Sequence, residues 1–229
     1  MKRNILITGG TKGIGWAIAQ KFHEQDFQVI ICARGEAGLE QAQSKLPGID
    51  TKKCDISQKE QVKGLGAYVN QKYGALDILI NNGGVFLPGE VHNEDDETYE
   101  QLMATNMDSA YYLTKTVLPL MLEKKAGTIF NMCSVASLQA YPNGGSYSIS
   151  KFALLGFSRA LREEMKDKGI RVISVLPGAV YTPSWEAVDL PESRFIPAED
   201  VAELIWSTYS ASIRTVVEEL LIRPALGDI

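Results

Sequence analysis

Cysteine and histidine are scarce in this sequence, and the few present form no metal-binding pattern. The three cysteines, Cys32, Cys54 and Cys133, include no CxxC pair and no even-numbered set that would indicate a disulfide framework. Each lies in or beside an apolar run, so we expect all three to be buried in a protein of the reducing cytoplasm. The two histidines, His23 and His92, are far apart in the chain. The sequence therefore predicts no metal site.

A basic stripe and a long apolar run are also missing. The 23 lysine and arginine residues are outnumbered by 28 aspartate and glutamate residues, which gives a formal net charge of -5. Because binding to nucleic-acid phosphates favours a basic surface, we expect no nucleic-acid partner. No run of about 18 apolar residues occurs and the apolar start is too short for a signal peptide, so we expect a cytoplasmic protein without a membrane segment.

Short apolar runs that alternate with longer amphipathic stretches make up most of the chain. Runs rich in isoleucine and valine are typical of parallel strands covered on both faces, and their alternation with helices indicates βαβ units. No repeat and no linker divides the sequence. We therefore predict one α/β domain over residues 1–229, with a Rossmann-type, doubly wound, parallel seven-stranded sheet and helices on both faces. The expected strands are 5–7, 29–31, 49–54, 76–80, 128–132, 172–176 and 220–222.

Helix starts are indicated near residues 13, 36, 57, 95, 147 and 197. Ser57 with Glu60 three residues later fits a capping box. The acidic run 94–97 is interpreted as a solvated helix start, where acids are favoured, and not as a cation site. An irregular, proline-containing stretch, 181–197, follows an expected strand, and we interpret it as a substrate lid in which Trp185 and Phe195 offer apolar contacts.

A glycine-rich segment follows the first expected strand and opens the first expected helix. Glycines let the backbone approach a pyrophosphate, whose charge a helix N-terminus stabilises. The spacing is TGxxxGxG instead of GxGxxG, and plain turns also carry glycine clusters. The strand before it and the amphipathic helix after it favour a dinucleotide-binding loop. Its candidate cofactor contacts are Gly9, Thr11, Lys12, Gly13, Ile14 and Gly15.

The end of the second expected strand bears on which dinucleotide binds. A Rossmann site usually has an acid there for the ribose 2′-hydroxyl, whereas this chain has Ala33 followed by Arg34. A guanidinium group fits a 2′-phosphate bidentately, and Lys12 adds positive charge. Glu36 is the opposing observation, because a carboxylate near this loop would suit NAD, although it also suits the first turn of the next helix. The sequence favours NADP(H) over NAD(H).

Seven motifs occur in order over most of the chain: 8–15, 54–56, 81–84, Asn106, Ser134, Tyr147 with Lys151, and 177–182. No single motif is decisive, since YxxxK occurs often by chance. As an ordered set, however, they resemble the motifs of the short-chain dehydrogenase/reductase family, including 3-oxoacyl-[acyl-carrier-protein] reductase-like and sepiapterin reductase-like members. The family's Asn-Asn-Ala-Gly segment is Asn-Asn-Gly-Gly here, which we expect to loosen the backbone near the cofactor.

Tyr147 and Lys151 are four residues apart and therefore share one face of the expected helix. A free phenol has a pKa of about 10, and a nearby ammonium group favours the phenolate and lowers that pKa. Tyr147 would then act as general acid or base while hydride moves between the nicotinamide and a small carbonyl or alcohol. The sequence thus predicts an NADP(H)-dependent oxidoreductase.

The resemblance implies roles for the other matched residues. Lys151 would bind the nicotinamide ribose, Ser134 would hold the substrate oxygen, and Asn106 would fix a proton-relaying water. Asp55 would contact the adenine. The remaining implied cofactor contacts are Ile56, Asn82, Gly83, Gly84, Pro177, Gly178, Val180 and Thr182.

Other readings of the sequence stay open at this point. A non-catalytic dinucleotide-sensing protein, an NAD-dependent alcohol dehydrogenase and a methyltransferase on a related sheet are the alternatives. The tail after Ser210 lacks the glycine-rich close common in 3-oxoacyl carrier-protein reductases. Around Tyr147 the helix is apolar on one side at Leu154 and Leu161 and on another at Phe152 and Leu155, so we expect a homodimer or homotetramer.

Overall fold

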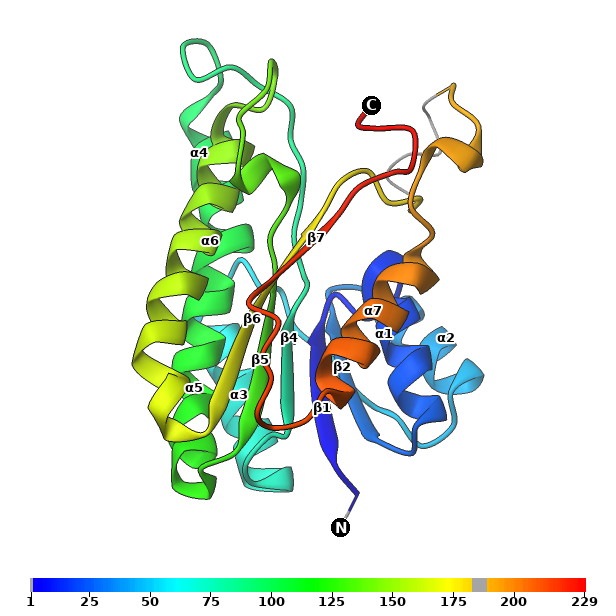
Figure 1. Cartoon of the computed structure of the whole chain (residues 1–229), viewed down its shortest axis with the longest axis vertical. Helices are drawn as coiled ribbons and strands as arrows, with labels where there is room; N and C mark the ends of the chain where they lie inside the picture. The colour runs from blue at the N-terminus through cyan, green and yellow to red at the C-terminus, as the bar shows by residue number, and fades with distance from the viewer. Residues whose placement is uncertain (1, 183–188) are drawn as a thin grey trace.

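A computed structural model describes residues 2–182 and 189–229, and it shows a doubly wound α/β fold (Figure 1). All seven strands are parallel and lie in the order β3-β2-β1-β4-β5-β6-β7. The predicted fold class is therefore confirmed. The strands are β1 (Asn4–Thr8), β2 (Gln28–Ala33), β3 (Asp50–Lys53), β4 (Ile78–Asn81), β5 (Gly127–Met132), β6 (Ile170–Pro177) and β7 (Glu219–Ile222).

Helices cover both faces of the sheet (Figure 1). Helices α1 and α7 pack beside each other on one face, whereas α3, α5 and α6 cover the other. The helices are α1 (Gly13–Glu24), α2 (Glu36–Lys45), α3 (Lys59–Tyr73), α4 (Asp96–Met103), α5 (Ser109–Lys124), α6 (Gly145–Met165) and α7 (Ala198–Ser210), with short turns η1 (Ala104–Asp108), η2 (Val135–Ser137), η3 (Lys166–Lys168) and η5 (Glu192–Arg194).

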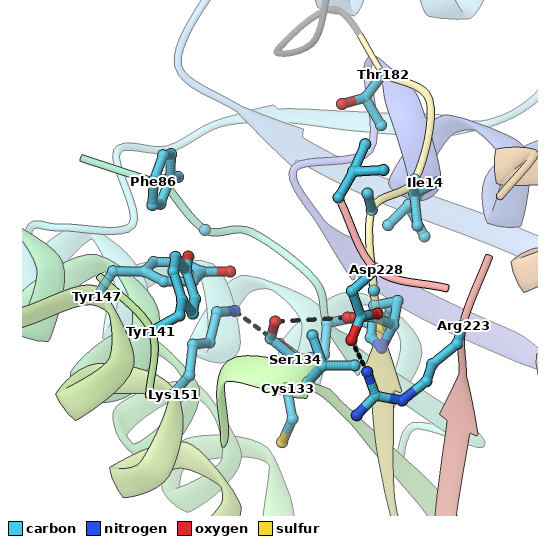
Figure 2. Close-up of a pocket in the computed structure, with 18 of the residues that line it drawn as sticks. Ile14, Phe86, Cys133, Ser134, Tyr141, Tyr147, Lys151, Thr182, Arg223 and Asp228 are labelled. Atoms are coloured by element: carbon cyan, nitrogen blue, oxygen red, sulfur yellow. Dashed lines mark hydrogen bonds and ion pairs between the residues drawn. The ribbon is translucent and has the colours of Figure 1, made fainter. Parts of the chain in front are cut away.

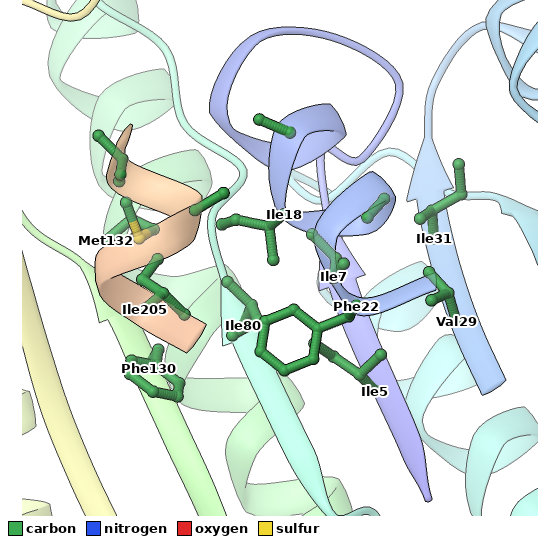
Figure 3. Packing of buried hydrophobic residues seen from close by; sticks show 14 of the residues in the cluster. Ile5, Ile7, Ile18, Phe22, Val29, Ile31, Ile80, Phe130, Met132 and Ile205 are labelled. Atoms are coloured by element: carbon green, nitrogen blue, oxygen red, sulfur yellow. The ribbon is translucent and has the colours of Figure 1, made fainter. Parts of the chain in front are cut away.

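Alternate residues of each central strand supply the two halves of the core. In β1, Ile5 and Ile7 face the α1 and α7 side, where Phe22 and Ile205 are also buried (Figure 3). Leu6 between them faces the opposite cluster. This double coverage explains why the strands read as continuous apolar runs. The three cysteines are free and buried, as expected from the sequence.

The helical region after residue 95 is not a single regular helix. Helices α4 and α5 are joined by the π-helical turn η1, which contains Asn106. The sequence did not indicate this turn. A π turn adds one residue to the helical repeat and is frequent at functional sites, because it re-aims a side chain without ending the helix.

The capping box expected at Ser57 and Glu60 is wrong. Helix α3 begins at Lys59, and its N-cap residue Gln58 makes no side-chain capping bond. The Ser57 hydroxyl and amide groups instead donate to Oδ1 of Asp55, at 2.8 and 3.0 Å. Asp55 closes a local turn that competes with helical capping, as short polar side chains often do.

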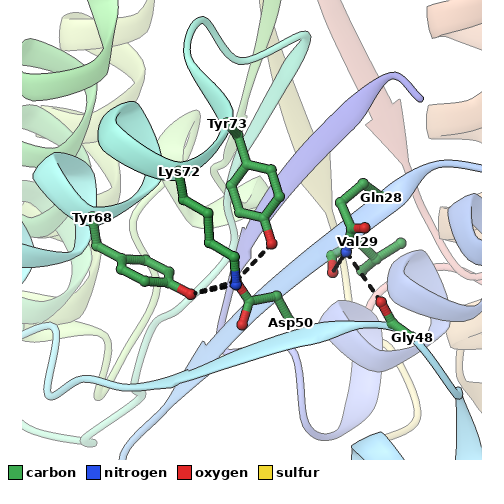
Figure 4. A network of polar contacts seen from close by, with 7 residues as sticks. All are labelled: Gln28, Val29, Gly48, Asp50, Tyr68, Lys72 and Tyr73. Atoms are coloured by element: carbon green, nitrogen blue, oxygen red, sulfur yellow. Dashed lines mark hydrogen bonds and ion pairs between the residues drawn. The ribbon is translucent and has the colours of Figure 1, made fainter. Parts of the chain in front are cut away.

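A half-buried carboxylate at the start of β3 joins that strand to the last turn of α3 (Figure 4). Oδ2 of Asp50 accepts hydrogen bonds from the hydroxyl groups of Tyr68 and Tyr73, at 2.6 and 2.7 Å, and from Nζ of Lys72 at 3.0 Å. Burial by itself raises the pKa of the Asp50 carboxyl, but the three donors outweigh burial and leave this pKa below its ordinary value.

Asp50→Asn should therefore destabilise the fold in a pH-dependent way. A carboxyl whose folded pKa is lowered contributes stability above its unfolded pKa and loses it as the pH falls through the folded pKa. We expect a loss of about 1–2 kcal/mol near neutral pH, after discounting for partial exposure. Urea denaturation at neutral pH and at successively more acidic pH values, from the unfolded pKa downward, measures it. An equal loss at all these pH values would contradict this account, and Tyr73→Phe is the control that keeps the charge.

Candidate active site

A cavity of about 640 Å³ opens at the carboxyl ends of β4, β5 and β6 (Figure 2). This is the edge at which doubly wound sheets bind ligands, and the volume is in the range of small-molecule sites. Half of the residues predicted for the site line it together. They are Ile14, Asn82, Gly84, Ser134, Tyr147, Lys151, Pro177, Gly178, Val180 and Thr182.

Tyr147 and Lys151 project from the first turns of α6 into this cavity (Figure 2). Nζ of Lys151 lies 5.7 Å from the centre of the Tyr147 ring and donates a hydrogen bond of 2.9 Å to the carbonyl oxygen of Met132. Helical spacing brought both residues to one face, as predicted. The ammonium group, however, bonds to the end of β5 and not to the phenol.

The expected lowering of the Tyr147 pKa is wrong for this structure. Burial raises the pKa of the Tyr147 phenol, and the nearby Ser134 hydroxyl only partly opposes that effect. Burial also lowers the pKa of Lys151, to about 8. Both shifts have one cause, since a low-dielectric surrounding disfavours the charged form of either group.

Ser134 follows β5 directly and caps the short turn η2. Its hydroxyl oxygen accepts a hydrogen bond of 3.2 Å from the amide of Ala136, and its hydroxyl group lies 3.5 Å from the carbonyl oxygen of Pro177. The backbone of Ser134 is also held in place, because its amide donates a hydrogen bond of 3.1 Å to the Ser137 hydroxyl. A serine held in this way has a fixed position between the ends of β5 and β6.

Asn106 is buried behind the cavity, where the π turn directs its amide group toward the β4 loop. Its Oδ1 accepts from the amide of Val85 at 2.9 Å, and its Nδ2 donates to Val85 O and to the Ser150 hydroxyl, each at 3.0 Å. A Cβ on Gly84 would lie 3.2 Å from Asn106 Oδ1 and 3.6 Å from Lys151 Nζ. Asn106 thus joins the β4 loop to α6. The water relay expected for it stays a prediction.

The glycine-rich loop packs directly on the segment that follows β4. Gly9 and Gly13 have positive φ angles of 67° and 54°, which favour glycine. A Cβ on Gly15 would lie 2.3 Å from the carbonyl oxygen of Gly9 and 2.5 Å from Nδ2 of Asn82. Asn82 in turn donates to the carbonyl oxygens of Thr8 and Gly9, at 2.8 and 3.3 Å. Gly15 therefore has no room for a side chain, and Gly9 and Gly13 have backbone conformations that favour glycine.

The missing methyl group at Gly83 does not leave a gap. A Cβ at this position would lie 2.4 Å from Cδ1 of Ile56, so the isoleucine side chain occupies that space. The amide of Gly83 also donates to the Thr8 hydroxyl at 2.8 Å. The expected loosening of the backbone is therefore not what the packing shows.

Arg34 and Glu36 differ in what they bind. Glu36 is paired with Lys53 through a 2.9 Å contact, whereas the exposed side chains of Arg34 and Lys12 make no hydrogen bond or ion pair within the described residues. Helix α1 also begins without a side-chain cap at Lys12. Thr11 faces Gly38, where a Cβ would lie 3.5 Å from it. These groups lie outside the cavity, toward the end of the cleft expected to hold the adenosine.

Several residues of the cavity were not found from the sequence. Phe86 and Tyr141 lie beside Tyr147, and the Phe86 ring meets the Tyr147 ring edge-on at 5.0 Å (Figure 2). Arg223 and Asp228 line the opposite side. No local motif marks any of these four, because they reach the cavity from segments far apart in the chain.

Glu94 was interpreted as part of a solvated acidic run, and that interpretation is wrong for this residue. Its carboxylate accepts hydrogen bonds from the hydroxyl and the amide of Ser146, in the first turn of α6. A Cβ on Gly89 or on Gly145 would lie 2.7 or 2.8 Å from Oε2 of Glu94. The carboxylate therefore supplies the cap that the N-cap residue Gly144 does not, next to Tyr147.

The stretch 181–197 is only partly described. Val180 bridges to Ile196, which ties the ends of the stretch together beside the cavity. Phe195 is buried with its ring 5.7 Å from that of Tyr181, and it is not among the described residues that line the cavity, so the contact expected for it is not seen. Trp185 lies outside the described residues.

The described residues contain neither a metal-binding cluster nor a membrane-spanning helix. They contain no group of three or more histidine, cysteine, aspartate or glutamate side chains arranged to hold a metal ion. Over residues 2–182 and 189–229, no helix combines the length and the apolar character needed to cross a bilayer.

Comparison with known proteins gives a consistent result. The chain is 36% identical over 241 residues to a sepiapterin reductase of Chlorobaculum tepidum, with 100% of this chain and 99% of the relative covered. It is 34% identical to a putative ketoacyl reductase of Streptomyces coelicolor, with 87% of each covered. Among solved structures, the actinorhodin polyketide ketoreductase with NADPH superimposes with a TM-score of 0.90 at 28% identity, covering 100% of this chain and 98% of that one.

A family model described as short chain dehydrogenase matches residues 3–192. The match includes the glycine-rich loop, Ser134, Tyr147 and Lys151 and extends past the end of β6. It excludes the methyltransferase alternative. The chain therefore belongs to the short-chain dehydrogenase family of oxidoreductases.

Proposed function

We propose that this enzyme reduces a small carbonyl compound with NADPH, or oxidises the corresponding alcohol, and that Tyr147 is its general acid–base. The observation that carries the proposal is the meeting of Ser134, Tyr147 and Lys151 in one cavity with the loop after β6. A phenol at this position can give a proton to the oxygen atom that gains negative charge during reduction. Ser134 holds that oxygen through its fixed hydroxyl group.

The residues present fit a dinucleotide. The absence of side chains at Gly9 and Gly15 lets the loop pack closely on the segment after β4, and the N-terminus of α1 that follows the loop has no side-chain cap, so its amide groups can meet a pyrophosphate. A bound NADP(H) would supply the hydride. The phosphate loop would hold its pyrophosphate, Arg34 and Lys12 its 2′-phosphate, Asp55 and Ile56 its adenine, and Val180 and Thr182 its carboxamide.

The preference for NADP(H) is supported by the pairing of Glu36 with Lys53, since Glu36 is the carboxylate that would suit NAD. Several structural neighbours were also solved with NADP or NADPH, among them ElxO, with a TM-score of 0.88 at 27% identity. The guanidinium group of Arg34, which follows β2, has no partner among the described residues and can donate to a 2′-phosphate.

Arg34→Ala tests this preference. We expect kcat/KM with NADPH to fall by about 10- to 100-fold, the value of one or two hydrogen bonds to a charged phosphate, while kcat/KM with NADH changes little. The measurement is oxidation of each cofactor, by its absorbance, with a panel of ketones. Glu36→Gln is the matched variant, and a fall in NADH activity for that variant alone would favour NAD. Failure of every ketone with both cofactors would favour a dinucleotide-sensing protein.

A homodimer or homotetramer is supported by apolar side chains on the outer faces of α5 and α6. Tyr111, Ile149 and Phe152 are 39%, 41% and 45% exposed, and Gly156 leaves open space beside them. Leu155, which was expected on this surface, is buried in the core instead. Analytical ultracentrifugation decides the point, and a monomer would exclude it. We also propose that the protein is located in the cytoplasm, which its three free cysteines support.

A further inference from the structure

Three of the described residues that line the cavity have a charged side chain: Lys151, Arg223 and Asp228. Lys151 is buried and bonded to Met132. Arg223 and Asp228 form an ion pair on the opposite side of the cavity from Tyr147, with Ser134 between them in Figure 2. The chemistry proposed for Tyr147 makes no use of this pair. Its position suits the far end of a bound substrate.

The two partners of this pair are held differently. Arg223 follows β7 directly, and the carbonyl oxygen of the preceding Ile222 accepts from the amide of Gly178 at 2.8 Å. Asp228 reaches the arginine only because the segment after β7 turns back, with the amide of Gly227 donating to Pro224 O at 2.9 Å. The backbone that carries Arg223 is therefore tied to the sheet, whereas Asp228 is carried on a segment without regular secondary structure.

The pair contributes little to the stability of the fold. The side chains of Arg223 and Asp228 are 40% and 47% exposed, and ion pairs with that exposure are worth about 0–1 kcal/mol. A guanidinium group binds any carboxylate through the same forked pattern of donors. When a carboxylate of the substrate binds Arg223 and the Asp228 carboxylate moves out of the cavity, the net charge of the cavity is unchanged. The exchange therefore costs little free energy.

We propose that Arg223 is the receptor for a carboxylate on the substrate, and that Asp228 occupies it until the substrate arrives. The cavity that holds both Arg223 and Tyr147 is also lined by apolar side chains, among them Phe86, Val135, Ala140 and Ile229, so we expect the middle of the substrate to be apolar. The substrate class is an oxo acid whose carbonyl group lies at Tyr147 and whose carboxylate lies at Arg223. This inference rests on the proposed carbonyl reduction.

The test compares linear oxo acids of increasing chain length with their methyl esters, using NADPH. The readout is the ratio of kcat/KM for the acid to that for its ester. In the unchanged enzyme the ratio should exceed one for the chain length that spans the cavity. Arg223→Gln should lower that ratio by about 10- to 100-fold, as expected for lost hydrogen bonds to a charged group. Asp228→Asn should raise it, because the competing carboxylate is gone.

Arg159→Gln is the matched control. Arg159 also pairs with a carboxylate, that of Glu219 in β7, at 2.6 Å, but it lies outside the cavity. Simple carboxylates should also inhibit ester reduction competitively, and Arg223→Gln should abolish that inhibition. Equal ratios in all variants, or a change only in the KM for NADPH, would overturn the proposal. Reduction of esters and acids alike leaves the proposed reductase intact and refutes this inference alone, whereas no reduction of either refutes both.

Discussion

Tyr147→Phe should lower kcat for carbonyl reduction by about 100- to 10,000-fold, the usual contribution of a positioned general acid. The substitution removes only the hydroxyl group and keeps the ring that meets Phe86 edge-on at 5.0 Å. The dissociation constant for NADPH, measured by fluorescence titration, should change much less. Tyr141→Phe removes a second phenol from the same cavity, and its effect should stay below about tenfold if only Tyr147 supplies the proton.

The raised pKa of Tyr147 predicts how the two directions depend on pH. Reduction requires the protonated phenol, and burial keeps this phenol protonated throughout the neutral range. Oxidation requires the phenolate, so its rate should increase as the pH rises toward the phenol's pKa. Initial rates in both directions across the pH range measure this. A reduction rate that already falls as the pH is raised through the neutral range would show that the pKa of Tyr147 is lowered during turnover.

The sheet was predictable because each central strand is covered on both faces. Burial of Ile5, Leu6 and Ile7 to opposite sides leaves no polar position in the middle of β1, and the sequence shows this as a continuous apolar run. The glycine-rich loop was predictable for a similar reason, since Gly15 has no room for a side chain. Requirements that act on neighbouring positions of the chain are visible in its sequence.

Contacts between distant segments were not predictable in this way. Helical spacing placed Tyr147 and Lys151 on one face, but it gave no information on their burial or on the Met132 carbonyl that takes the ammonium group. Glu94 caps a helix that begins about fifty residues later, and Asp228 reaches Arg223 only through a turn. These contacts depend on tertiary packing. The capping signal at Ser57 failed for a different, local reason, because Asp55 holds Ser57 in a turn.

Gly15→Ala should nearly abolish cofactor binding. The added Cβ would lie 2.3 Å from the carbonyl oxygen of Gly9 and 2.5 Å from Asn82 Nδ2, so either the phosphate loop or the segment after β4 must move. Because Asn82 holds both segments through Thr8 and Gly9, a shift of one displaces the other. We expect the dissociation constant for NADPH to rise at least about 100-fold, equivalent to one or two lost hydrogen bonds to a phosphate.

The same substitution at Gly64 in α3 is the matched control. A Cβ on Gly64 would contact nothing within 4 Å, so Gly64→Ala should stabilise the fold by about 0.5–1 kcal/mol and leave NADPH binding unchanged. Urea denaturation of both variants separates the two effects, since overpacking at Gly15 should cost about 1–3 kcal/mol. If Gly15→Ala bound NADPH normally, the pyrophosphate could not lie against this loop, and the orientation proposed for the cofactor would have to be abandoned.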